Sequence, residues 1–376
     1  MSFIEGPIII GAGPSGLAIA ASLTGLSVPY IILERSTGIA DLWRNHTYDR
    51  LSLHLPKQFC ELPHLPFPPN FPIYPSKSQF LQYLETYTSH FSITPQFSKN
   101  VIEARFDSSS SVWRVKAKNS NGGVVVYVSK WIVVATGENA EPVIPIVKGR
   151  ERFKGDVLHS GEYRNGDRYK GKKVLVIGCG NSGMEICLDL FDHGALPLLD
   201  MFGVSTFDLA VKLLKGLPVK LVDQFLVLAS KMILGDAEKY GLRRPKVGPL
   251  EIKNITGKSP VLDVGALSLI KSGKIKVVPE VETFTTNGGR FIDGNEITFD
   301  SILFATGYRS NVPLWLKNCD FFTGDGKPKN AFPYGWKGEN GLYTVGFTGK
   351  GLYGASSDAL KVAQDIAQIW SKTPNK

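Results

Sequence analysis

Short apolar runs that lead into a glycine turn or an acidic residue recur along the chain and predict the strands of a parallel sheet. Four of them are Ile8–Ile10, Tyr30–Leu33, Trp131–Ala135 and the run that begins at Val174. Strands that are apolar throughout, with no alternation, are typical of parallel sheets that helices cover on both faces. Helical segments follow the first and the last of these runs. This succession of strand, turn and helix indicates an α/β fold of the doubly wound kind.

A second pattern, the alternation of apolar and polar residues, predicts antiparallel strands in the first half of the chain. They are expected at Val101–Phe106, Val112–Ala117 and Val124–Ser129. A helix is expected at Lys77–Ser89. The proline-rich passage Leu55–Pro75 cannot be a regular helix or a central strand, because proline lacks the backbone N–H that both require.

The second half of the chain repeats features of the first. Ser301–Phe304 runs into Ala305-Thr306-Gly307, as Trp131–Ala135 runs into Thr136-Gly137. The repetition predicts two dinucleotide-binding, Rossmann-like domains, with the second inserted into the first. We expect residues 1–148 and 291–376 to form the first domain and residues 149–290 the second. Further strands are expected at Lys274–Val278 and Leu342–Val345, and an amphipathic helix at Ser356–Trp370.

Composition narrows the class of protein. The chain has 376 residues, 43% of them apolar, which suffices for two or three globular units. Its four cysteines form no C-x-x-C pair, so a pyridine-nucleotide disulfide reductase, which needs a redox pair, is disfavoured. Reduced thiols suit the cytoplasm. The net charge of +9 has its densest patch at Arg243-Arg244-Pro-Lys246, which lacks the interleaved aromatic residues of a nucleic-acid surface.

The most apolar late stretch, Val204–Leu234, is interrupted by charged residues, among them Lys212, Lys215, Lys220, Asp223 and Lys231, so no transmembrane span is predicted. A buried pair of amphipathic helices is favoured there. Peripheral contact with a membrane surface, such as that of the endoplasmic reticulum, stays open as an alternative. The sequence predicts no oligomeric state.

The glycine turn near the N-terminus predicts a site for FAD. Gly11, Gly13 and Gly16 follow a strand and open the helix Ser15–Leu23. In such a turn the first glycine permits the tight bend, the second lets a pyrophosphate approach the backbone, and the third lets helix and strand pack. Glu34 ends the next strand at the spacing expected of a ribose contact and favours an unphosphorylated ribose, which suits FAD better than NADPH.

A second turn of the same kind, Gly178-x-Gly180-x-x-Gly183, predicts a nicotinamide dinucleotide in the inserted domain. Its expected second strand is reduced to Leu196–Leu199, which contains a proline, and no Arg or Lys lies between Met184 and Ala210. We therefore expect a shortened NADPH-binding domain that lacks a proper second strand. The further cofactor-binding candidates in the two domains are Pro14, Ser15, Arg35, Thr136, Gly137, Asn181, Ser182, Thr306 and Gly307.

Between the two turns lies Phe153-x-Gly155-x-x-x-His159-x-x-x-Tyr163, which resembles the identifying sequence of the flavin-containing monooxygenases. The plant YUCCA branch of that family is similar over nearly the whole chain, from about Gly6 to Trp370. The similar segments are Leu42–Arg44, Tyr48–Cys60, Ala135–Asn139, Leu242–Pro245, Gly257–Gly265, Phe304–Tyr308 and Gly341–Phe347.

The resemblance implies an enzyme that uses NADPH, FAD and O2 to convert indole-3-pyruvate, a 2-oxo acid, into the auxin indole-3-acetic acid and CO2. It implies that Trp43 and Arg44 flank the flavin ring, and that His54 and Lys57 shape the catalytic oxygen site. Two departures stand out. The wider family often has Asn at the position of His54, and YUCCA-like chains carry a strand and a basic loop between Ala195 and Met201 that this chain lacks.

Two alternatives remain at this point. One is a flavin monooxygenase that acts on amine or sulfur nucleophiles. The other is a shortened, weakly active isoform that binds FAD, which the missing segment near residues 195–201 favours.

Overall fold

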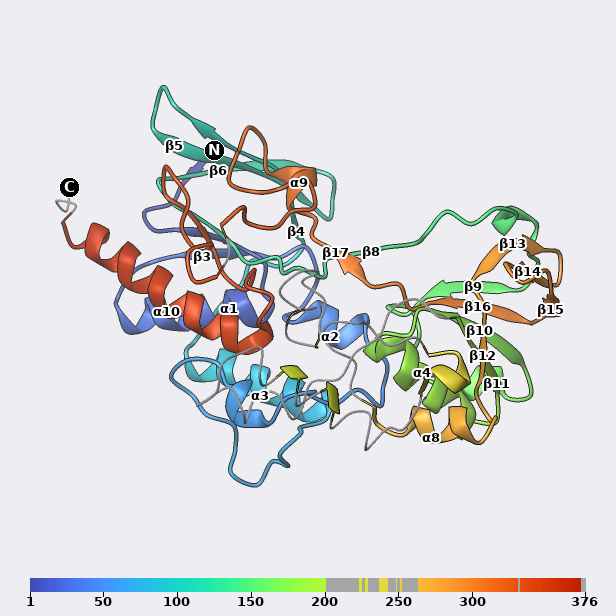
Figure 1. The fold of residues 1–376 in the computed structure, drawn as a ribbon. Coiled ribbons are helices and arrows are strands. Elements are labelled where there is room, and N and C mark those ends of the chain that lie inside the picture. The colour runs from blue at the N-terminus through green and yellow to red at the C-terminus, as the bar shows by residue number, and fades with distance from the viewer. Residues whose placement is uncertain are drawn as a thin grey trace. The chain divides into compact units, whose positions relative to one another are not determined.

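The computed structural model describes residues 1–200, 223–224, 227–228, 237–242, 248, 251, 263–330 and 332–372. Its contacts divide the chain into two compact units (Figure 1). The first contains residues 1–45, 51–141 and 308–376, and the second contains residues 46–50 and 142–307. The chain thus leaves the first unit at 141/142 and returns at 307/308, compared with the expected 148/149 and 290/291. Which dinucleotide each unit binds stays a prediction.

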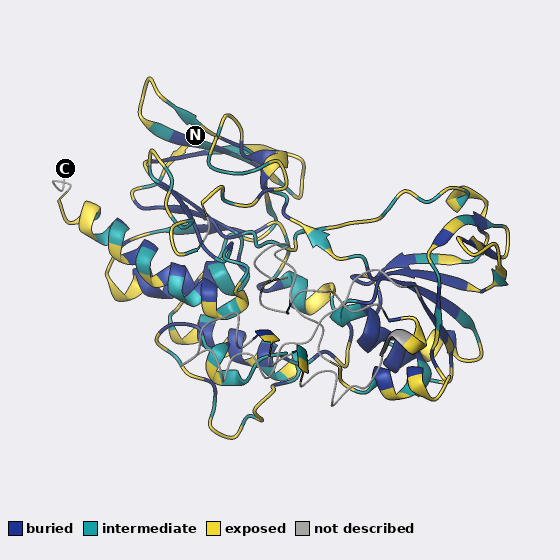
Figure 2. Ribbon diagram, viewed as in Figure 1, coloured by how far each residue is buried: buried dark blue, intermediate teal, exposed yellow. Residues whose placement is uncertain are grey.

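A four-stranded parallel sheet forms the centre of the first unit. Its order is β18 (Leu342–Thr344), β7 (Ile132–Val134), β2 (Ile8–Ile10) and β3 (Ile31–Leu33). Ile9 on one face packs against α1 (Pro14–Gly25), α3 (Lys77–His90) and α10 (Gly351–Trp370). Ile8 and Ile10 on the other face pack against the antiparallel layer. Burial on both faces explains why these strands are apolar throughout (Figure 2).

The antiparallel layer confirms the strands predicted from alternation. It consists of β4 (Lys99–Asp107), β5 (Val112–Asn119) and β6 (Val124–Ser129), with the short β1 (Ser2–Phe3) parallel to β6. Inward residues such as Trp113 and Val115 are buried, while their neighbours are partly exposed. The predicted helix α3 begins at a capping box, in which Ser76 and Gln79 satisfy each other's backbone N–H groups. The remaining elements of this unit are α2 (Asp41–Asn45), η1 (Lys57–Phe59), β17 (Tyr308–Arg309) and α9 (Val312–Trp315).

The second unit has a five-stranded parallel sheet in the order β12 (Lys276–Val278), β11 (Leu196–Asp200), β10 (Lys173–Ile177), β16 (Ser301–Phe304) and β9 (Asp156–His159). One face carries a small antiparallel sheet of β13 (Val281–Thr285), β14 (Gly288–Phe291) and β15 (Glu296–Thr298). Phe284, Phe291 and Phe299 fill the space between the two sheets. The described helices are α4 (Asn181–Asp192), α8 (Ala266–Lys271) and the short turns η2 (Arg150–Arg152), η3 (Asp167–Tyr169) and η4 (Ala237–Tyr240). The two-residue β8 (Glu141–Pro142) spans the boundary between the units.

The expectation that this sheet lacks a proper second strand is wrong. Residues Leu196–Asp200 form β11, which pairs with β10 along its whole length and with β12 from Leu198 onward. Leu196 donates its N–H to the carbonyl of Lys172. Because successive N–H groups point to opposite sides of a strand, the nitrogen of Pro197 faces the side of β12, where pairing begins only one residue later. The proline therefore costs the sheet no hydrogen bond.

The predicted helix pair within Val204–Leu234 lies almost wholly outside the described residues, as does Arg243-Arg244-Pro-Lys246. Among the described residues, no helix is long and apolar enough to cross a membrane.

Candidate dinucleotide-binding sites

The first glycine turn has the geometry that its spacing predicts. Gly11 has φ +106°, and a Cβ there would lie 2.7 Å from the carbonyl oxygen of Ala135. A Cβ on Gly16 would lie 1.9 Å from the carbonyl oxygen of Gly11. Both positions exclude a larger residue, one through its left-handed backbone and both through close approach to neighbouring backbone.

Gly13 differs, because a Cβ there would meet nothing within 4 Å. Its role is therefore not to relieve crowding inside the protein. It lies as the N-cap of α1, whose first N–H groups have no partner within the helix and carry the positive end of the helix dipole. Thr136 lies next to the same turn, because a Cβ added at Gly11 would be 3.3 Å from its Cα. The buried Oγ1 of Thr136 has no hydrogen-bond partner among the described residues. An open space before a helix N-terminus, beside an unsatisfied hydroxyl, fits a diphosphate group.

Glu34 directly follows β3 and is only 7% exposed. Its Oε2 accepts a hydrogen bond of 2.7 Å from the backbone N–H of Ala12 inside the turn, and its Oε1 accepts one of 2.8 Å from Ser36. These bonds fix the carboxylate beside the glycine turn. Each carboxylate oxygen has a second lone pair for a ribose hydroxyl.

The second glycine turn has nearly the same geometry as the first. Gly178 has φ +107°, with its added Cβ 2.5 Å from the carbonyl oxygen of Ala305. A Cβ on Gly183 would lie 1.8 Å from the carbonyl oxygen of Gly178, and one on Gly180 would meet nothing within 4 Å. Asn181 and Ser182 open α4, as Pro14 and Ser15 open α1. The duplicated motif thus builds two equivalent sites, one in each unit. Each consists of a glycine turn and the helix N-terminus that follows it, and is here called a cradle.

His159 of the identifying sequence lies where the chain enters and leaves the second unit. His159 is 2% exposed, and its Nδ1 accepts the N–H of Gly161 at 3.2 Å. Its Nε2 therefore carries the proton and donates to the carbonyl oxygen of Gly307 at 3.1 Å. The N–H of Val143 donates to the same carbonyl at 2.9 Å, and the hydroxyl of Thr306 donates to the carbonyl of Val143. Burial lowers the pKa of His159 and so favours the neutral form of the imidazole.

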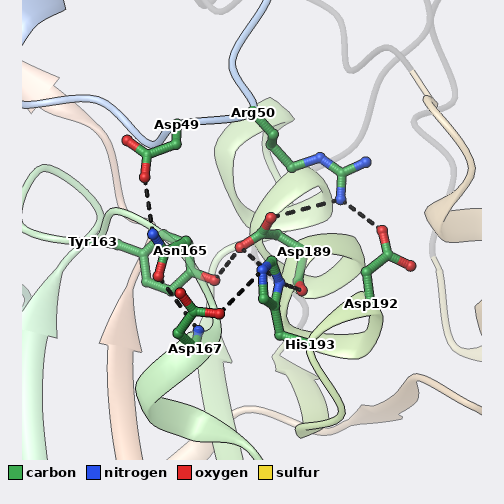
Figure 3. Close-up of polar contacts among 8 residues, drawn as sticks. All are labelled: Asp49, Arg50, Tyr163, Asn165, Asp167, Asp189, Asp192 and His193. Carbon is green, nitrogen blue, oxygen red and sulfur yellow. Dashed lines mark hydrogen bonds and ion pairs between the residues drawn. The ribbon is translucent and has the colours of Figure 1, made fainter.

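The other residues of the identifying sequence have structural contacts in the second unit. The ring of Phe153 packs with that of Phe299, at 5.4 Å between centroids. A Cβ on Gly155 would lie 2.2 Å from the carbonyl oxygen of Asp300. The hydroxyl of Tyr163 donates to Asp189 Oδ2 at 2.6 Å (Figure 3). Burial and this carboxylate raise the pKa of Tyr163.

Residues predicted to flank the flavin lie in the first unit. The ring of Trp43 meets that of Phe80 edge to face, with centroids 4.6 Å apart. Arg44 forms an ion pair of 2.7 Å with Glu85, and both residues of this pair are partly exposed. Arg35 pairs with Glu141 at 3.1 Å. The contacts of Trp43 and Arg44 orient α2 on α3. The predicted flavin contacts of these two residues and the predicted cofactor contact of Arg35 stay predictions.

Lys57 has a structural role that the sequence did not indicate. Its Nζ donates to the carbonyl oxygens of Pro68, Pro69 and Phe71, at 3.1, 3.1 and 2.7 Å. The three bonds match the three donors of an ammonium group and tie down the proline-rich passage. His54 lies half-buried just before η1. The predicted catalytic roles of His54 and Lys57 stay predictions.

A buried acid that sequence reasoning missed lies beside the first turn. Asp358 on α10 is 2% exposed, and its Oδ2 accepts the N–H of Gly346 at 3.2 Å. A Cβ on Gly346 would lie 2.2 Å from the hydroxyl of Ser15. Burial raises the pKa of Asp358 to about 6. The available signal was an acid on the apolar face of a predicted amphipathic helix.

The geometry defines a protein with two dinucleotide cradles on two Rossmann-like units. A family model described as flavin-binding monooxygenase-like matches residues 7–320. The chain is 58% identical to the indole-3-pyruvate monooxygenase YUCCA8 of Oryza sativa, over 98% of this chain and 92% of that protein. It is 56% identical to the probable indole-3-pyruvate monooxygenase YUCCA1 of Arabidopsis thaliana, over 98% and 91% of the two chains.

The chain belongs to the flavin-binding monooxygenase-like family, and within it to the YUCCA-type indole-3-pyruvate monooxygenases. This confirms the predicted enzyme class and the predicted cofactors, FAD and NADPH. The alignment with the rice protein spans 389 positions and so exceeds the 376 residues of this chain, which means that it opens gaps here. The fold resembles a flavin monooxygenase of Stenotrophomonas maltophilia, with a TM-score of 0.73 at 21% identity over 98% and 99% of the two chains.

Proposed function

We propose that this protein converts indole-3-pyruvate, with NADPH, a proton and O2, into indole-3-acetic acid, CO2, NADP⁺ and water. Nearly full-length identity of 58% to a relative named for this reaction is the observation that carries the proposal. One oxygen atom of O2 enters the new carboxyl group of the product, and the other leaves as water. The two electrons that this requires come from NADPH.

The two cradles support a division of labour between the units. The N-terminus of α1, open at Gly13 and beside Thr136, would hold the diphosphate of FAD, and Glu34 its ribose. The N-terminus of α4, open at Gly180, would hold the diphosphate of NADPH. Bound FAD supplies the acceptance of hydride and the activation of O2. In such folds the end of the second strand contacts the 2′-phosphate, and the residues after β11 lie outside the described part of the chain.

The chain's own contribution to the chemistry is to orient these groups and exclude water. Lys57 fixes the proline-rich passage next to His54 in the sequence, and His54 is proposed to help shape the oxygen site. We place the enzyme in the cytoplasm, because its four cysteines are free thiols, three of them buried.

The decisive assay incubates the purified protein with indole-3-pyruvate, NADPH and ¹⁸O2. We expect NADPH-dependent formation of indole-3-acetic acid that carries one ¹⁸O atom. A parallel incubation with a thioether and a tertiary amine tests the alternative of an oxygenase of soft nucleophiles. Preferential oxidation of those compounds, or product that forms equally well without O2, would contradict the proposal.

A further inference from the structure

Residues His46–Arg50, here called the strap, interrupt the first unit but belong by their contacts to the second. The strap directly follows α2, which carries Trp43 and Arg44, and Leu51 after it belongs again to the first unit. The other two crossings lie within β8, at 141/142, and at the start of β17, at 307/308, and these two strands pair with each other. The strap is held in the second unit by noncovalent bonds, so these bonds can be removed one at a time.

Backbone bonds attach the strap to the loop that follows the identifying sequence. The N–H of Asp49 donates to the carbonyl oxygen of Arg164 at 2.9 Å. The Nη1 of Arg164 donates to the carbonyl oxygens of Gly161 and Tyr163, both at 2.9 Å, and reaches that of Thr47 at 3.5 Å. Arg164 therefore links the turn after His159 to the strap.

Side chains add an electrostatic anchor (Figure 3). Arg50 Nη1 lies 2.9 Å from Asp192 Oδ2 and 3.8 Å from Asp189 Oδ1. Asn165 Nδ2 donates to Asp49 Oδ2 at 2.9 Å. The side chain of Asp189 is only 6% exposed, and its other oxygen accepts the hydroxyl of Tyr163. A cation beside a buried carboxylate is worth more than a pair on the open surface, because water screens it less.

We propose that the strap is a positioning element for hydride transfer between the two cofactors, and that Arg50 is its anchor. This inference rests on the proposed function. Arg50 and His54 are four positions apart in the sequence, and a chain spans at most about 3.6 Å per residue, so their Cα atoms lie within about 14 Å of each other. By the same reasoning Trp43 lies within about 11 Å of His46. A strap held in the second unit therefore limits how far that unit can move from the residues predicted to surround the flavin.

This limit matters because hydride transfer requires the reacting atoms of two bound molecules to meet at close range, and small misplacements of reactants slow reactions strongly. Arg50 forms its ion pairs with Asp189 and Asp192 in the last turn of α4, at the opposite end of that helix from the glycine turn, so it acts through the strap and is a positioning residue. Its loss should leave the FAD cradle of the first unit intact and should affect the step that needs both units.

The test compares Arg50→Ala and Arg50→Lys with a matched control, Arg290→Ala. Arg290 also forms an exposed ion pair of 2.9 Å in the second unit, with Glu282 on the β13–β14 hairpin. Three quantities are measured for each protein: bound FAD per chain, the rate constant of flavin reduction at saturating NADPH without O2, and hydrogen–deuterium exchange of the strap amides. The exchange measurement needs neither cofactor turnover nor substrate.

We expect Arg50→Ala to keep its FAD, to exchange the Asp49 amide faster, and to be reduced about tenfold or more slowly than wild type. Arg50→Lys should recover part of both effects, since its ammonium can still face the two carboxylates, and Arg290→Ala should match wild type. Wild-type reduction rates in Arg50→Ala, or unchanged strap exchange, would overturn the inference. Failure of NADPH to reduce the wild-type protein would instead contradict the proposed function, and the exchange data would still decide whether Arg50 anchors the strap.

Discussion

His159 Nε2 donates a hydrogen bond of 3.1 Å to the carbonyl oxygen of Gly307, the last residue of the second unit. The same carbonyl accepts the N–H of Val143, which lies just after the other crossing point of the chain. The Gly307 carbonyl thus joins the outgoing and returning segments, and the buried imidazole of His159 binds that carbonyl as a clamp. Each of the two ring nitrogens of His159 has a backbone partner, so a structural role suffices to explain this histidine.

Replacing this clamp should lower stability in a pH-dependent way. We expect His159→Leu to reduce the free energy of unfolding by about 1–3 kcal/mol at pH 8, because the buried Gly307 carbonyl and Gly161 N–H lose partners. The folded-state pKa of His159 lies below its unfolded value, so its stabilising effect is complete above the unfolded pKa and is lost as pH falls through the folded pKa. The difference between variant and wild type should therefore shrink toward pH 5 in urea titrations. A difference that grows with acidity would contradict this account.

The contribution of Asp358 to stability should depend on pH in the opposite direction. Its pKa is raised from 3.8 to about 6, so its contribution is complete below the unfolded pKa and is lost as pH rises through about 6. Asp358→Asn keeps an oxygen acceptor for Gly346 without a buried charge. We expect it to be more stable than wild type by about 2 kcal/mol at pH 8 and nearly equal at pH 4. Glu151→Gln, at a carboxylate 73% exposed, is the control and should change neither value. Equal stability of Asp358→Asn and wild type at pH 8 would refute the burial argument.

The equivalent substitution in each of the two cradles should affect a different cofactor. Gly13 and Gly180 have ordinary φ values of −78° and −71°, and an added Cβ at either meets no protein atom. Alanine should therefore fold at both positions and obstruct only the bound diphosphate. We expect Gly13→Ala to lose the yellow absorbance of FAD, and Gly180→Ala to keep it while flavin reduction requires far more NADPH.

Gly11→Ala serves as the contrasting variant, because φ of +106° and a contact of 2.7 Å should destabilise the apoprotein itself. Thermal unfolding without cofactor separates the two cases. Loss of FAD from Gly180→Ala but not from Gly13→Ala would reverse our assignment of the cofactors to the units.

The sequence predicted those features that depend on local pattern. The apolar runs at β2 and β7 and the spacing Gly11-x-Gly13-x-x-Gly16 determine the parallel sheet and the cradle, because burial on both faces and the tight turn leave few other residues possible. The YUCCA resemblance supplied the reaction, which no spacing of residues could. Pro197 led to the wrong prediction for β11, since the compatibility of a proline with a strand depends on which neighbouring strand its nitrogen faces.

Features that depend on long-range contact were not predictable. Nothing local to Arg50 shows that it meets Asp192, which lies 142 residues later. The same holds for Asp358 and Gly346, whose relation depends on how α10 packs on α1. The unit boundary at 307/308 likewise follows from the pairing of β16 with β9 and β10, which an apolar run alone does not reveal.

Substitutions of Lys57 can distinguish a structural role of its ammonium group from a catalytic one. Its ammonium donates to three carbonyl oxygens of the proline-rich passage, and hydrogen bonds to a charged group contribute about 1.5–3 kcal/mol each in favourable settings. We expect Lys57→Met to free residues 66–73, which limited proteolysis detects as new cleavage there, with FAD content unchanged. Lys57→Arg, which keeps the charge but not the compact three-donor head, should be intermediate. If Lys57→Met resists proteolysis as well as wild type and still loses turnover, the ammonium acts in the oxygen site and its structural role is minor.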